Sequence, residues 1–182
     1  MSSQPNKERA STLAELLKDR PKRGRPPRRV SRQNVYVALT DKEKQLLEHL
    51  VQFLPAHLVR ADLPDLAIAV LTARLDSLHR AVADRNREIP EGVTDLESLY
   101  LLWDLEVPAR IVERKWTSIR VSPQEVIELG RAHGTLNAAF GANRSEIFSL
   151  ALVLLNQFFD TEQLPDIQSL PELRKLILSK YL

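Results

Sequence analysis

The chain has 182 residues, 43% of them apolar and 27% charged, which is typical of a globular protein, and its lack of cysteine excludes disulfides and thiolate metal sites. The net charge of +2 is unevenly distributed: residues 1–33 hold ten Lys or Arg against three Asp or Glu, whereas residues 34–182 hold sixteen against twenty-one. A basic segment joined to an acidic remainder is typical of proteins that bind nucleic acid.

Residues 1–33, hereafter the arm, contain no stretch that could bury a core. Half of the fourteen residues in 20–33 are basic and none is acidic, and three prolines and one glycine exclude a regular helix there. We therefore expect the arm to be extended and disordered, outside the folded part of the protein.

Residues 34–39 alternate between apolar and outward positions, which is the period of a half-buried strand. The apolar set is Val35, Val37 and Leu39, and the outward set is Asn34, Tyr36 and Ala38. A capping box from Thr40 to Glu43 then predicts a helix that continues to Pro55. A second helix is expected from Asp62, and residues 66–78 are apolar almost all round, as in a buried central helix.

The same order of elements returns about eighty residues later. A second alternating segment has the apolar set Thr117, Ile119 and Val121 and the outward set Trp116, Ser118 and Arg120. Ser122 to Glu125 is interpreted as a second capping box, and a buried helix is predicted over 147–159.

The two segments align at a nearly constant offset, which indicates an internal repeat. Leu39 matches Val121 at an offset of 82, and Leu66 matches Ile147 at 81. The alternative is a chance match between two amphipathic segments. Weaker tail helices are expected over 94–105 and 169–182, so we divide the chain into the arm and two repeats, 34–108 and 109–182.

A short strand, a capped helix, a break and a buried second helix, present twice, resemble the ribbon-helix-helix fold of the MetJ and Arc repressors. The run Asn143-Arg144-Ser145-Glu146-Ile147 is similar to the start of that family's second helix. The resemblance, over residues 34–80 and 116–159, implies a mainly α fold of tandem ribbon-helix-helix units with a two-stranded antiparallel ribbon. Because the chain holds two units, we expect the strands to pair within one molecule.

In that family the ribbon enters the major groove of DNA, where outward residues contact base edges. By position, the resemblance assigns base contacts to Asn34, Tyr36, Trp116, Ser118 and Arg120. It assigns phosphate binding at the start of the second helix to Asn143, Arg144 and Ser145. The first repeat departs from the pattern, because Asp62 and Asp65 place negative charge at the corresponding point. A solvated sheet face is the alternative for the strand residues.

The arm contains Arg23-Gly24-Arg25-Pro26 within a basic, proline-rich stretch, and this motif is similar to an AT-hook. Glycine lets the backbone sit deep in the minor groove, proline keeps the chain extended, and the arginines suit the narrow groove of A·T-rich DNA. The predicted DNA contacts of the arm are Lys22, Arg23, Gly24, Arg25, Pro26, Arg28, Arg29 and Arg32. The alternative is a generic basic tail that binds any polyanion.

The sequence has no glycine-rich phosphate loop, no cysteine nucleophile and no cluster of His, Asp and Glu, so we expect no enzyme activity, cofactor or metal. Its longest apolar stretch, 147–159, is too short to span a bilayer, and its first residues lack the apolar core of a signal peptide. We therefore expect a cytoplasmic, nucleoid-associated prokaryotic protein.

Three roles on double-stranded, A·T-rich DNA follow from these features. The first is a transcriptional regulator, and the second is an architectural or plasmid-partition protein. The third is an antitoxin-like protein whose folded part binds a protein partner. The tail helices are candidates for joining units into a symmetric homo-oligomer.

Overall fold

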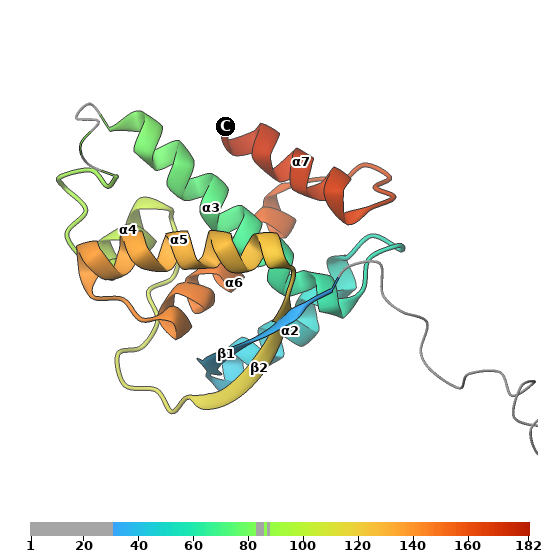
Figure 1. Cartoon of the computed structure of the whole chain (residues 1–182), viewed down its shortest axis with the longest axis horizontal. Helices are drawn as coiled ribbons and strands as arrows, with labels where there is room; N and C mark the ends of the chain where they lie inside the picture. Colours follow the sequence, from blue (N-terminus) through green and yellow to red (C-terminus); the bar gives the residue numbers. More distant parts are fainter. Residues whose placement is uncertain (1–30, 83–85, 87) are drawn as a thin grey trace, which may run out of the picture. The chain divides into compact units, whose positions relative to one another are not determined.

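The two alternating segments form seven-residue strands, β1 (Gln33–Leu39) and β2 (Lys115–Val121). They pair antiparallel in a two-stranded ribbon (Figure 1). The register sets Val35 opposite Ile119 and Val37 opposite Thr117. The predicted pairing within one molecule is thereby confirmed. The structure, a computed structural model, describes residues 31–82, 86 and 88–182, and Ser31–Leu182, hereafter the body, form one compact unit.

The described residues also form six α-helices, so the protein is mainly helical, as predicted. They are α2 (Asp41–Leu50), α3 (Leu63–Ala81), α4 (Leu96–Leu102), α5 (Pro123–Phe140), α6 (Arg144–Thr161) and α7 (Leu170–Tyr181). Two short 3-10 helices, η1 (Val51–Phe53) and η2 (Arg60–Asp62), lie between α2 and α3. The helix predicted to continue to Pro55 therefore changes from α to 3-10 hydrogen bonding after Leu50. The two tail helices, α4 and α7, are shorter than expected.

One of the two predicted capping boxes is confirmed and the other is wrong. At the start of α2, Thr40 Oγ1 accepts a hydrogen bond from the Glu43 amide at 3.1 Å, and Glu43 Oε2 accepts one from the Thr40 amide at 2.7 Å. At the start of α5 the Ser122 side chain makes no capping bond. The Ser122 amide donates instead to Asp65 Oδ1 on α3, at 2.9 Å, which leaves Glu125 free to contact another helix.

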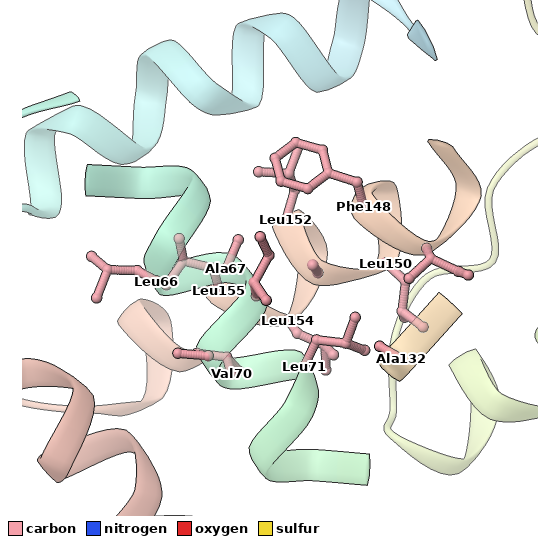
Figure 2. Close-up of a cluster of buried hydrophobic side chains, with 14 of the residues drawn as sticks. Leu66, Ala67, Val70, Leu71, Ala132, Phe148, Leu150, Leu152, Leu154 and Leu155 are labelled. Atoms are coloured by element: carbon pink, nitrogen blue, oxygen red, sulfur yellow. The ribbon is translucent and has the colours of Figure 1, made fainter. Parts of the chain in front are cut away.

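The core lies between α3 and α6, the two helices that the sequence predicted to be buried (Figure 2). Leu66, Val70 and Leu71 on α3 and Phe148 and Leu154 on α6 belong to this core, and all five are fully buried. Each such side chain stabilises the fold by roughly 1.5–3 kcal/mol through burial alone. These two helices are therefore the main hydrophobic contribution to the fold.

The segments 34–108 and 109–182 are interlocked rather than placed side by side. From the first segment, α2 packs against α6 of the second, while α5 of the second packs against α3 of the first. The tail helix α7 also packs against α3. Buried residues of both segments belong to one hydrophobic cluster, so they share a single core.

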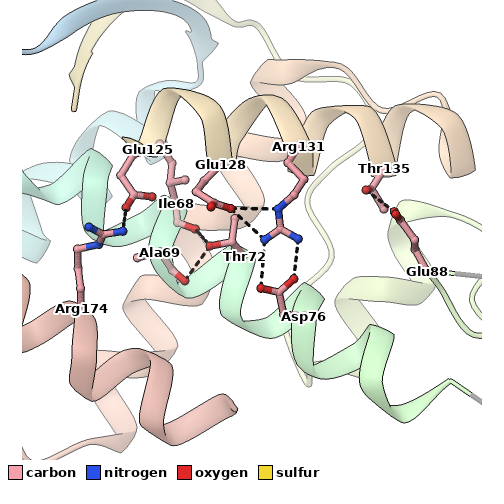
Figure 3. Close-up of polar contacts among 10 residues, drawn as sticks. All are labelled: Ile68, Ala69, Thr72, Asp76, Glu88, Glu125, Glu128, Arg131, Thr135 and Arg174. Carbon is pink, nitrogen blue, oxygen red and sulfur yellow. Dashed lines mark hydrogen bonds and ion pairs between the residues drawn. The ribbon is translucent and has the colours of Figure 1, made fainter. Parts of the chain in front are cut away.

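Polar contacts fix α5 over α3 on the surface of the body (Figure 3). Arg131 on α5 donates to both carboxylate oxygens of Asp76 on α3, at 2.6 and 3.1 Å, and also to Glu128. Half-exposed ion pairs of this kind contribute up to about 1 kcal/mol each. They orient the helices, whereas the apolar core supplies most of the stability.

The ribbon register predicts that cysteines at Tyr36 and Ser118 will form a disulfide within one chain. These residues are directly opposite each other, so their Cα atoms should be about 4.5–5.5 Å apart, within the range of a disulfide. After oxidation of the doubly substituted chain, non-reducing electrophoresis should show a monomer closed by one internal bond. Each single substitution is the control, and links found only between chains would contradict the register.

Candidate nucleic-acid interface

The outward face of the ribbon is formed by alternate residues of both strands, because neighbouring side chains of a strand point to opposite faces. The register sets Asn34 opposite Arg120, Tyr36 opposite Ser118 and Ala38 opposite Trp116. All six residues that the sequence assigned to the outward face thus lie in three cross-strand pairs. Five of them are exposed, and these include two large aromatic residues, Tyr36 at 64% and Trp116 at 75%.

Ala38 is the exception, because only 8% of its surface is exposed. Its amide donates to Ser145 Oγ at 2.8 Å, and its carbonyl accepts from Arg114 Nη1 at 3.1 Å. Both contacts place Ala38 beneath the start of α6, where its small methyl group leaves little surface open. The end of the ribbon that holds Ala38 is therefore bound closely to the helices.

The ribbon differs in charge from the rest of the body. Neither strand contains Asp or Glu, although residues 34–182 as a whole carry more acidic than basic residues. Arg120 is exposed and makes no hydrogen bond or ion pair with another described residue. Lys115, at the other end of β2, lies 3.6 Å from Asp41 in an exposed ion pair, which is weak in water. Of the six outward residues, Arg120 alone is charged, so the outward face has one exposed positive charge and no carboxylate.

The start of α6 contains the three residues predicted to bind phosphate. Asn143 caps the helix, with its Oδ1 accepting from the Glu146 amide at 3.1 Å, and it remains exposed together with Arg144. Ser145 is buried, and its hydroxyl is engaged with the amide of Ala38. Two of the three residues therefore face solvent, while Ser145 connects α6 to the ribbon.

The start of α3 differs, because Arg32, which the sequence assigned to the arm, forms ion pairs with its two carboxylates. The side chain of Arg32 is only 8% exposed and forms ion pairs with Asp62 and with Asp65, the latter at 3.4 Å. Burial raises the pKa of Asp65 above its ordinary value, although the Ser122 amide and Arg32 act in the opposite direction. Arg32, assigned by the sequence to DNA, is thus part of the body, and its guanidinium pairs with carboxylates there.

Arg114 is a structural residue that sequence reasoning missed. Its Nη1 donates to the Ala38 carbonyl and to Ser149 Oγ, at 3.1 and 2.9 Å, and lies 3.3 Å from Glu43 Oε2. It joins the start of β2 to β1, α2 and α6. The sequence feature that could have identified Arg114 is the repeat. Arg114 follows Arg32 by 82 residues, and each arginine directly precedes its strand.

The remaining predicted contacts of the arm lie outside the described residues. They are Lys22, Arg23, Gly24, Arg25, Pro26, Arg28 and Arg29. The basis for them remains the sequence, in which residues 1–30 hold nine Lys or Arg against three Asp or Glu.

Comparison with family models, curated proteins and solved structures gives no match to this chain. Among the described helices, no single one is long and apolar enough to cross a membrane, and α5 and α6 reach that threshold only together, as a pair bent by 111°.

Proposed function

We propose that this protein binds double-stranded DNA, with the ribbon in the major groove and the arm in an A·T-rich minor groove. The observation that carries the proposal is the exposed, acid-free outward face of the ribbon within an otherwise acidic body. A two-stranded ribbon fits the major groove, which is about 12 Å wide and presents a distinct pattern for each base pair.

The proposal includes a tandem ribbon-helix-helix body, and three features support it. The repeat offset of 82 makes Tyr36 equivalent to Ser118, and these residues are opposite each other in the ribbon. A local two-fold axis relating the repeats would therefore pass between them. The crossed packing of α2 on α6 and α5 on α3 fits such an axis. The two anchoring arginines, Arg32 and Arg114, are related by the same offset.

The arm would supply most of the affinity, because phosphate neutralisation dominates the binding of proteins to DNA. The body carries an excess of acidic residues and would add specificity rather than attraction. This division of labour fits a transcriptional regulator better than an architectural or partition protein that coats DNA, since coating requires many phosphate contacts.

Arg120→Ala is predicted to weaken binding to the specific site by roughly 1–3 kcal/mol and to affect random DNA little, because an arginine can pair with the edge of a guanine. Arg144→Ala, which removes a phosphate contact, should instead weaken binding to all sequences equally. Mobility-shift titrations on both kinds of duplex separate the two effects.

The matched control is Lys175→Ala, which removes one exposed positive charge from α7, outside the ribbon. It should leave binding to both duplexes close to that of the unmodified chain. If Arg120→Ala gave the same footprint and the same affinities as this control, the ribbon would not face DNA.

A further inference from the structure

We propose that the ribbon reads a duplex site whose two halves differ, with hydrogen bonds to purines at one end and contacts to thymine methyl groups at the other. The inference rests on the DNA-binding function proposed above and adds the class of site. It follows from the pairing of outward residues across the ribbon.

A ribbon made of two identical strands would have two identical ends, and operator symmetry mirrors protein symmetry in such cases. Here the offset of 82 makes Asn34 equivalent to Trp116, and Ala38 equivalent to Arg120. An amide thus corresponds to an indole, and a methyl group to a guanidinium. The local two-fold axis holds for the backbone and fails for the outward side chains.

The polar end is the cross-strand pair of Asn34 and Arg120, both of which are exposed. An arginine side chain pairs with the O6 and N7 atoms of guanine, and an asparagine side chain pairs with the N6 and N7 atoms of adenine. Directly opposite residues have Cβ atoms about 4.5–5.5 Å apart, so the pair can reach neighbouring base pairs. This end therefore favours a step that contains guanine and adenine.

The apolar end is the pair of Ala38 and Trp116, with Tyr36 next to it at the centre of the ribbon. Trp116 is 75% exposed and Tyr36 is 64% exposed, and exposed large apolar surface of this kind marks an interaction site. In the major groove the one apolar group on a base edge is the thymine methyl, which apolar side chains contact. This end therefore favours thymine.

The helix starts that flank the two ends of the ribbon also differ in charge, as the outward side chains do. Ser145 Oγ, which binds the Ala38 amide, sets the start of α6 with its exposed Arg144 at the apolar end. At the polar end, Asp65 binds the Ser122 amide, and Asp62 and Asp65 pair with Arg32. A phosphate contact from the body is available at the apolar end, whereas carboxylates occupy the corresponding position at the polar end. One chain should therefore bind its site in a single orientation.

The test begins with selection of bound duplexes from a random pool by the full-length chain. We expect the motif under one ribbon to differ from its own inverted complement, with guanine and adenine on one side and thymine on the other. The guanine is the distinguishing base, because adenine on one side and thymine on the other are related by inverted complement. Arg120→Ala should relax the preference on the first side, and Trp116→Ala on the second, each by about tenfold in affinity for the selected base. Both side chains are exposed, and thermal melting of each variant checks that the fold is retained.

Orientation is measured by DNA cleavage from a chelated iron attached at Gln33→Cys or at Lys115→Cys, two positions at opposite ends of the ribbon in a chain without native cysteine. Each probe should cut one side of the motif, and the two probes should cut opposite sides. Cuts on both sides from each probe, or a palindromic motif, would overturn the inference and leave DNA binding intact. Absence of any enriched duplex would overturn the proposed function and the inference together.

Discussion

Removal of residues 1–30 is expected to lower the affinity for duplex DNA by about a hundredfold or more at low salt. It should also make the slope of log K against log salt shallower by several units. The deleted segment holds nine Lys or Arg against three Asp or Glu. For each phosphate that is no longer neutralised, the slope of log K against log salt should fall by about 0.9. The truncation stops before Ser31 because Arg32 pairs with Asp62 and Asp65 and belongs to the body.

The measurement is a salt titration of binding for the complete and the truncated chains, with thermal melting to verify that the body remains folded. The matched control keeps the charge and changes its shape: Arg23→Lys combined with Arg25→Lys should preserve the slope. It should reduce the preference for A·T-rich over G·C-rich duplexes, because lysine lacks the flat guanidinium that suits a narrow groove. A slope unchanged by the truncation would place the phosphate contacts in the body.

The local features of the fold could be predicted from sequence because their causes lie within a few residues. Alternation at 34–39 and 116–121 specified which face of each strand is buried, and the Thr40 box marked the start of α2. Pairing between the strands could also be predicted, although they are far apart in sequence. The repeat made both partners visible, and the structure gives their register.

The contacts that sequence reasoning missed depend on residues far apart in the chain. Ser122 has the sequence of a cap, yet its amide binds Asp65, which lies 57 residues earlier. Arg32 belongs to a basic segment, yet α3 provides carboxylates that bury it. In both cases the partner is a carboxylate at the start of α3, and only the packing of α3 against one end of the ribbon shows this.

Glu125→Gln is expected to stabilise the protein at pH 8 and to have little effect at pH 5. Glu125 lies in the first turn of α5 and is fully buried, with Arg174 of α7 as its ion-pair partner (Figure 3). Neither of its carboxylate oxygens accepts a well-aligned hydrogen bond from the described residues. Burial raises the pKa of Glu125 to about 7; Arg174 lowers it in part, and the negative charges of Asp65 and Glu128 raise it further.

The direction of the pH effect follows from proton binding. In the unfolded chain the carboxyl has its ordinary pKa of 4.5, so between that value and about 7 the folded chain holds a proton that the unfolded chain has released. The free energy of unfolding therefore falls as the pH rises through this window, by on the order of 3 kcal/mol for a shift of this size. A glutamine has no such proton to release and avoids the buried charge above pH 7.

Urea unfolding of both chains at pH 5 and pH 8 measures the effect. The difference in unfolding free energy should be below about 1 kcal/mol at pH 5, and should favour Glu125→Gln by roughly 2–3 kcal/mol at pH 8. The matched control is Glu128→Gln on the same helix, whose partly exposed side chain pairs with Arg131 at 2.9 Å and should show no such dependence. A Glu125→Gln chain less stable than the original at pH 8 would mean that the ion pair with Arg174 outweighs the cost of burying both charges. In that case α7 would be held on the body mainly by charge, and otherwise its apolar contacts through Leu173 and Ile177 hold it there.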